Sequence, residues 1–263
     1  MLAVQAGVVA APRPVARLAW LERFRGPGWA LVPIGSIVLV IFAIRYVSGT
    51  ATGLTDLALV AVPILAAVAL GWAMRGAKPL AALAAIPLFV LAWRSENTLA
   101  GEAAATLLSA LSCVTLGVLL SAVTPTRWLK AGIVLMAAAD VWLVATDLLQ
   151  SPNNALVAAA PPAGLPQLQA EVFGSVSMGY GDLFVAALLG AVLASQWRRQ
   201  WHAAVLTLVL AGCFDLLFFF INELPATVPV ALALIVMEAS ERVSVARRRR
   251  PSMRADAIPR QAR

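Results

Sequence analysis

Charged residues are scarce in this sequence. Only 13% of its 263 residues are charged, whereas 61% are hydrophobic. Soluble domains carry about 25% charged residues, so the composition excludes an ordinary soluble globular protein. Inside a bilayer every backbone polar group must be bonded within the protein, which favours helices. We therefore expect an all-α fold, a polytopic transmembrane helix bundle.

Cysteine and histidine are also nearly absent. The two cysteines, Cys113 and Cys213, lie in apolar runs, where a cysteine is typically a small buried hydrophobe rather than half of a disulfide. The one histidine, His202, follows Arg198 and Arg199 closely. A single histidine is too few for a histidine-based metal site and offers little basis for a serine–histidine nucleophile. We therefore expect no metal and no cofactor.

Long apolar runs separated by short polar breaks dominate the chain. Several reach the roughly 20 residues needed to cross the hydrocarbon core. Pro79 and Pro87 shorten the third run, and Glu238 shortens the last. The predicted spans are about 29–47, 54–74, 79–93, 103–123, 128–149, 172–197, 201–221 and 224–243.

Basic residues fix the orientation of these spans. If eight spans alternate, nearly all arginines and lysines fall on one side, and only Arg45 and Arg94 fall on the other. The side rich in basic residues is cytoplasmic, so both termini are expected in the cytoplasm, most simply at a prokaryotic plasma membrane. The net charge of +7 is then a topology signal and does not indicate a nucleic-acid partner.

The chain divides by composition into four parts. Its first residues have no basic region before the apolar stretch, so we do not expect a cleaved signal peptide. The last part is a basic, disordered tail that can contact anionic lipid. The expected parts are a cytoplasmic N-terminal segment at 1–27, N-terminal transmembrane helices at 28–125, a catalytic-type group of helices at 126–243, and the tail at 244–263.

Four acidic residues lie within predicted spans, where a charge costs about 3 kcal/mol at the bilayer centre. They are Asp140, Asp147, Asp182 and Asp215. Asp140 precedes Gln150 by ten residues, and Asp182 follows Glu171 by eleven. If both segments are helical, both aspartates lie about 15 Å from the external surface, on consecutive antiparallel spans. Asp147 is then interfacial, and Asp215 lies at about half that depth.

Two aspartates at one level can perform joint chemistry. Neighbouring carboxylates share a proton, so one can act as a base on water while the other acts as an acid. Gly179 and Gly181 would let a substrate backbone approach Asp182. A plainer interpretation stays open, because small residues in membrane helices also serve packing, and an intramembrane aspartate can belong to a proton relay or a structural pair.

Three motifs occur in a characteristic order. Gly179-Tyr180-Gly181-Asp182 matches the pattern GxGD, the segment from Ala139 to Val144 resembles a YD segment with alanine in place of tyrosine, and the segment from Leu224 to Pro229 resembles a PAL segment with Thr227 in place of leucine. Over residues 128–243 the chain thus resembles the presenilin and signal peptide peptidase family of intramembrane aspartyl proteases.

The resemblance implies a catalytic pair, Asp140 and Asp182. It implies membrane-spanning peptides or proteins in a lipid bilayer as substrates, and an active-site polarity similar to that of signal peptide peptidase. The positions implied to bind or support the substrate are Gly179, Tyr180, Gly181, Pro225, Ala226 and Thr227.

The chain departs from the family pattern in three ways. It has eight predicted spans where the family usually has nine, and it carries Ala139 and Thr227 at two motif positions. The span count also places Pro225 near the external surface, above the aspartates. Either the segment around residues 222–223 dips into the membrane, or the predicted boundary is displaced.

Two other classes of protein remain open. A proton-coupled transporter or a catalytically inactive scaffold could use the four acids as a relay. A potassium-channel-like pore could use GYGD, but a selectivity filter also needs a pore helix and a tetramer. Ser177 and Met178 stand where a filter has threonine and valine, and the chain after Asp182 continues as an apolar run. Oligomeric state is not predicted.

Overall fold

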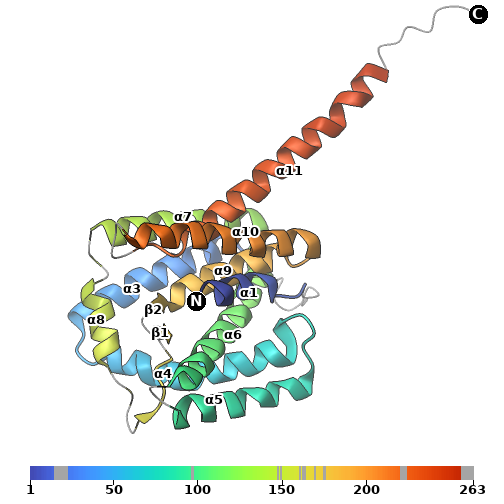
Figure 1. The fold of residues 1–263 in the computed structure, drawn as a ribbon. Coiled ribbons are helices and arrows are strands. Elements are labelled where there is room, and N and C mark those ends of the chain that lie inside the picture. Colours follow the sequence, from blue (N-terminus) through green and yellow to red (C-terminus); the bar gives the residue numbers. More distant parts are fainter. Residues whose placement is uncertain are drawn as a thin grey trace, which may run out of the picture.

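The computed structural model is almost entirely helical in the part of the chain that it describes (Figure 1). The described residues are 1–14, 23–95, 98–146, 148, 150–159, 161, 164–168, 170–173, 176–219 and 224–255. The helices are α1 (Leu2–Ala10), α3 (Val32–Tyr46), α4 (Thr50–Val68), α5 (Ala85–Arg94), α6 (Leu99–Val123), α7 (Thr126–Ala145), α8 (Gln150–Ala158), α9 (Tyr180–Leu193), α10 (Trp197–Asp215) and α11 (Val228–Ala255). Short helical turns flank some of them, at Pro27–Leu31, Ala69–Ala73, Pro79–Ala84 and Leu216–Phe219.

The predicted helical bundle is confirmed, but its eight spans are not. Four helical stretches in the described residues are long and apolar enough to cross a membrane, namely Pro27–Tyr46, Thr50–Ala73, Leu99–Val123 and Thr126–Ala145. Pro79–Arg94 and Tyr180–Leu193 are apolar but shorter. These helices are compatible with a membrane protein.

Helices α6 and α9 form the centre of the bundle. Both bury apolar residues along most of their length, and α6 also packs on α4 and α5. At their crossing a Cβ on Gly117 would lie only 2.9 Å from the backbone of Ala187. Small residues let helix backbones approach closely in this way, so Gly117 sets the spacing between α6 and the helix that carries Asp182.

The start of α9 differs from the prediction. Residues 172–197 were expected to form one helical span, yet β1 (Ala170–Phe173) and β2 (Val176–Gly179) form an antiparallel hairpin before α9. Valine and phenylalanine favour strands, and glycine disfavours helix interiors, which explains why the helix begins only at Tyr180. The external loop expected at 151–171 likewise contains α8.

Helix α1 was not predicted at all. It is only nine residues long, and it buries Gln5, Val8 and Val9 against the bundle. Figure 1 shows α1 lying across the middle of the bundle, close to α9, and it also contacts α10. Residues 1–27 had been assigned to a cytoplasmic segment, but the first ten of them are part of the packed structure.

Candidate active site

Asp140 lies on α7, where its carboxylate meets the PAL-like segment. Thr227 Oγ1 donates a hydrogen bond of 2.6 Å to Asp140 Oδ2, and the Thr227 backbone N–H makes a longer contact of 3.5 Å with the same oxygen. Hydrogen bonds from a hydroxyl to a carboxylate are typically 2.5–2.7 Å long. Thr227, which stands where the PAL motif has leucine, is therefore a direct partner of Asp140.

Asp182 lies in the first turn of α9. Its Oδ2 accepts a hydrogen bond of 3.0 Å from the backbone N–H of Gly179, the residue just before the helix. An acidic side chain at this position satisfies one of the unpaired N–H groups of a helix start, and it is stabilised by the helix dipole. The local fold therefore fixes the carboxylate at the helix end.

The two predicted aspartates, Asp140 and Asp182, lie within electrostatic reach of each other. The predicted equal depth of the two aspartates required a helix through residues 172–182, and this prediction is wrong because Val176–Gly179 form a strand, with about 3.3 Å of rise per residue. The position of Asp182 depends instead on the hairpin, because β2 ends directly before α9 and Asp182 lies in the first turn of that helix.

The glycines of GYGD have different surroundings. A Cβ on Gly179 would lie 3.3 Å from Asp182 Oδ2, whereas a Cβ on Gly181 would meet nothing within 4 Å. A side chain at position 179 would thus crowd the Asp182 carboxylate slightly, while Gly181 faces open space. Close packing against another helix therefore does not explain the glycines at positions 179 and 181.

Tyr180 anchors the start of α9 to α6. Its hydroxyl lies 2.7 Å from Ser112 Oγ, and Cys113 Sγ lies 3.7 Å from its backbone oxygen. Tyr180 and Gly181 are the first two residues of the helix. Their backbone is therefore helical, not the extended run that lines a potassium filter.

The PAL-like segment reaches the level of Asp140. Pro225 and Ala226 are half-buried, and Thr227 is buried directly before α11. Pro225 was expected above the aspartates, but the contact of Thr227 with Asp140 places this segment beside Asp140. Residues 222–223 lie outside the described residues.

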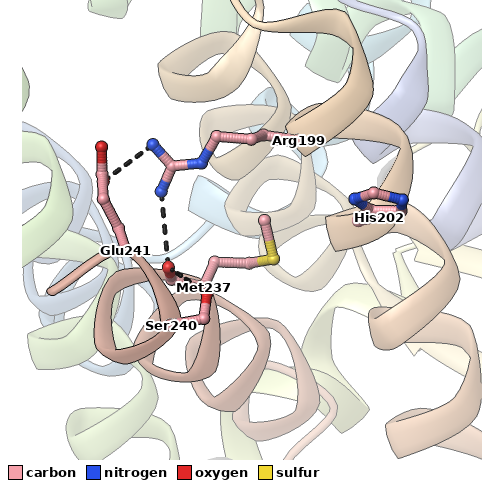
Figure 2. A pocket seen from close by; sticks show the side chains of 5 residues that line it. All are labelled: Arg199, His202, Met237, Ser240 and Glu241. Atoms are coloured by element: carbon pink, nitrogen blue, oxygen red, sulfur yellow. Dashed lines mark hydrogen bonds and ion pairs between the residues drawn. The ribbon is translucent and has the colours of Figure 1, made fainter. Parts of the chain in front are cut away.

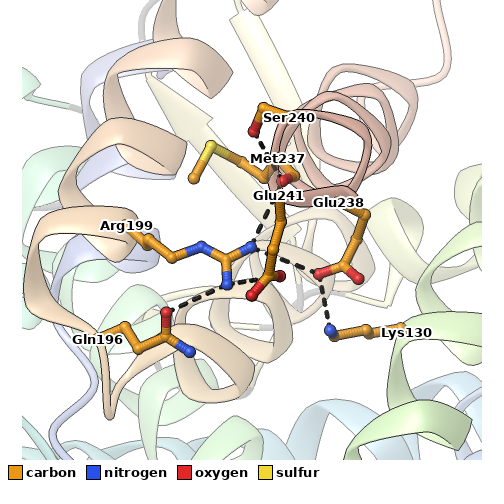
Figure 3. Close-up of polar contacts among 7 residues, drawn as sticks. All are labelled: Lys130, Gln196, Arg199, Met237, Glu238, Ser240 and Glu241. Atoms are coloured by element: carbon orange, nitrogen blue, oxygen red, sulfur yellow. Dashed lines mark hydrogen bonds and ion pairs between the residues drawn. The ribbon is translucent and has the colours of Figure 1, made fainter. Parts of the chain in front are cut away.

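An ionic cluster joins α7 to α11 at a second point. Lys130 Nζ lies 2.7 Å from Glu238 Oε1, while Arg199 of α10 lies 3.7 Å from Glu238 and 2.8 Å from Glu241 (Figure 3). Lys130 precedes Asp140 by ten residues, and Glu238 follows Thr227 by eleven, which is about 15 Å along each helix. The antiparallel pair α7 and α11 is therefore fixed both at the candidate site and at this distant cluster.

A cleft of about 380 Å³ lies beside this ionic cluster, between α10 and α11 (Figure 2). Its lining residues are Arg199, His202, Met237, Ser240 and Glu241. Two of them, Arg199 and Glu241, form an ion pair. The cleft contains neither aspartate of the pair, so it is separate from the candidate active site.

Of the other two acids predicted within spans, the structure describes only Asp215, which does not join the pair. Asp215 is exposed at the last residue of α10, and Asp147 lies outside the described residues. Within the part of the chain that the structure describes, no three histidine, cysteine or acidic residues gather as metal ligands.

Sequence reasoning missed two contacts of the site. Ser112 was not singled out, and neither was Gln5, whose Nε2 donates a hydrogen bond of 2.9 Å to the Ala226 carbonyl. A glutamine inside an otherwise apolar stretch was the one available signal for Gln5. No family model, curated protein or solved structure matches this chain.

Proposed function

We propose that the protein is an intramembrane aspartyl endopeptidase, which hydrolyses peptide bonds within transmembrane segments by means of Asp140 and Asp182. One observation carries the proposal: Asp140 is held by Thr227 of the PAL-like segment while it lies within electrostatic reach of Asp182 of GxGD. Three segments far apart in the sequence that resemble the motifs of one protease family thus converge on one place.

The hydrogen bonds suggest different roles for the two aspartates. Asp140 receives both the hydroxyl and the backbone N–H of Thr227, whereas Asp182 receives the Gly179 N–H. Donors favour the ionised form of a carboxylate, and two neighbouring carboxylates hold one proton between them. We assign the negative charge to Asp140, as the base, and the shared proton to Asp182, as the acid.

The reaction then follows general acid–base chemistry. Asp140 takes a proton from water through Oδ1, since both contacts with Thr227 use Oδ2. The water oxygen attacks the peptide carbonyl carbon while Asp182 gives its proton to the carbonyl oxygen, which forms a gem-diol. Asp140 returns its proton to the amide nitrogen, the C–N bond breaks, and Asp182 recovers a proton from the diol.

The substrate must be locally extended to react, because the amides of a helix are hydrogen-bonded and shielded. No protein atom lies within 4 Å of a Cβ placed on Gly181, and we propose that the extended substrate backbone approaches Asp182 on this side. The resemblance implies that such a substrate can add as a strand near the PAL-like segment, and the hairpin that ends at Gly179 lies directly before Asp182.

The basic residues suggest the direction of the substrate. With both termini cytoplasmic, the loop between the two aspartate helices is external. By resemblance to signal peptide peptidase, the substrates are then single-span helices with a cytoplasmic N-terminus. A proton-coupled transporter would instead show proton-linked flux and no cleavage.

An affinity label for aspartyl proteases tests the site. A photoreactive analogue of the gem-diol intermediate should label the purified wild-type protein, and Asp140→Asn and Asp182→Asn should each lose the label. Asp215→Asn is the matched control, since Asp215 lies at the exposed end of α10, and it should label normally. Equal labelling of all four proteins would contradict the proposal.

A further inference from the structure

Helix α1 touches the PAL-like segment through a single buried polar side chain. Gln5 is 1% exposed, and its amide donates to the carbonyl of Ala226, the residue that precedes Thr227. Burial of an amide is unfavourable unless it is hydrogen-bonded. Leucine or methionine would fill the same space in this apolar helix, so packing alone does not account for glutamine at this position.

Hydrogen bonds from a side chain of α10 hold the C-terminal end of α1. Gln200 Nε2 donates to the carbonyls of Val9 at 3.0 Å and Pro12 at 2.9 Å, and Arg75 donates to Gln200 Oε1. A Cβ on Gly190 would lie 2.3 Å from the Val9 carbonyl oxygen, so only glycine lets α1 approach α9 this closely. Helix α1 is thus fixed at its far end, independently of Gln5.

A short chain of contacts leads from α1 to the aspartate pair. Gln5 holds the Ala226 carbonyl, the next residue is Thr227, and Thr227 donates to Asp140. Before α11 the segment forms a turn, in which the Val228 N–H donates to the Pro225 carbonyl at 3.2 Å and the Ala231 N–H donates to the Thr227 carbonyl at 3.1 Å. Neither of these bonds uses the Ala226 carbonyl, which accepts from Gln5 instead.

We infer that α1 is a positioning element of the active site, and that Gln5 is a positioning residue which holds Thr227 against Asp140. This inference rests on the proposed protease function for its effect on turnover. Its structural part, the fixing of the PAL-like segment by Gln5, does not depend on that function and can be tested separately.

The test compares Gln5→Met with Val8→Ala. Methionine keeps the volume and helix propensity of glutamine but cannot donate a hydrogen bond, whereas Val8→Ala truncates another buried side chain of the same helix. With a transmembrane peptide substrate, Gln5→Met should lower kcat about tenfold with KM changed less than about twofold, because the loss of this hydrogen bond to the half-buried Ala226 residue corresponds to roughly that factor. Val8→Ala should leave kcat within about twofold of wild type.

A second measurement does not require proteolysis. Ala226→Cys is introduced into a Cys213→Ser background, because Cys213 is exposed whereas Cys113 is buried. Adding Gln5→Met should raise the rate of N-ethylmaleimide labelling at position 226 at least about fivefold, and adding Val8→Ala should not.

Three results would overturn the inference. One is an unchanged labelling rate in Gln5→Met, another is an equal increase in both α1 variants, and the third is a higher kcat in Gln5→Met, which would make α1 an obstruction. If even the wild-type protein fails to cleave, the proposed function fails, but the labelling comparison still decides the role of Gln5.

Discussion

Thr227 donates its side-chain hydroxyl to Asp140 Oδ2 at 2.6 Å. Thr227 stands where the PAL motif of the family that the sequence resembles has leucine, and Ala139, beside Asp140, stands where that family has tyrosine. At position 227 this chain thus has a hydrogen-bond donor to Asp140 that leucine could not supply.

Removal of this hydroxyl should reduce turnover. Thr227→Val keeps the shape of the side chain but leaves Asp140 without its short hydrogen bond, and a bond to a charged group contributes about 1.5–3 kcal/mol. We expect kcat/KM to fall by about 10- to 100-fold. Thr227→Ser, which keeps the hydroxyl, should stay within about fivefold of wild type. Equal activity of the serine and valine variants would contradict this role.

The two glycines of GYGD should respond differently to alanine. A methyl group on Gly181 meets no protein atom within 4 Å, so Gly181→Ala should fold normally and keep its melting temperature within about 2 °C, a change typical of harmless surface substitutions. It should nevertheless raise KM for an extended substrate, because the methyl group occupies the space proposed for the substrate. Measurement of KM with peptides of increasing side-chain size would show whether the effect grows with substrate bulk.

Gly179→Ala is the comparison for that experiment. Its methyl group would lie 3.3 Å from Asp182 Oδ2, so it should disturb the carboxylate and lower kcat rather than raise KM. If both alanine variants lower kcat alone, Gly181 does not face the substrate.

The ionic cluster around Glu238 should stabilise the bundle. Its side chain is 28% exposed and lies between Lys130 and Arg199, so Glu238→Gln leaves two cations without their shared partner. We expect a loss of about 1 kcal/mol, the upper range for partly exposed pairs, measured as a lower melting temperature in detergent. Glu241→Gln is the matched control, since the Glu241 side chain is 46% exposed, and its effect should be smaller.

Much of the bundle could be predicted because long apolar runs leave few alternatives to helices. The predicted start of the Asp182 helix was wrong, because hydropathy does not distinguish an apolar strand from an apolar helix. Helix α1 was missed because nine residues are too few to meet the length criterion for a span.

The sequence singled out the residues of the candidate site but revealed none of their contacts. GxGD and the in-span position of Asp140 singled out two aspartates that the structure brings within electrostatic reach. The bond between Thr227 and Asp140 depends on where the PAL-like segment enters the bundle, and span counting placed that segment too far from the aspartates. The contact of Gln5 with Ala226 joins residues 221 positions apart, which no local pattern reveals.

Cleavage of a transmembrane peptide by the purified protein tests the central claim most directly. Wild-type protein in liposomes is compared with Asp140→Asn and Asp182→Asn, and the products are identified by mass spectrometry. The account predicts that the wild-type protein cuts within the membrane segment and that each variant slows cutting by at least about 1,000-fold, since each aspartate acts in proton transfer. Asp215→Asn should cut normally. Cleavage by Asp182→Asn at the wild-type rate would contradict the account.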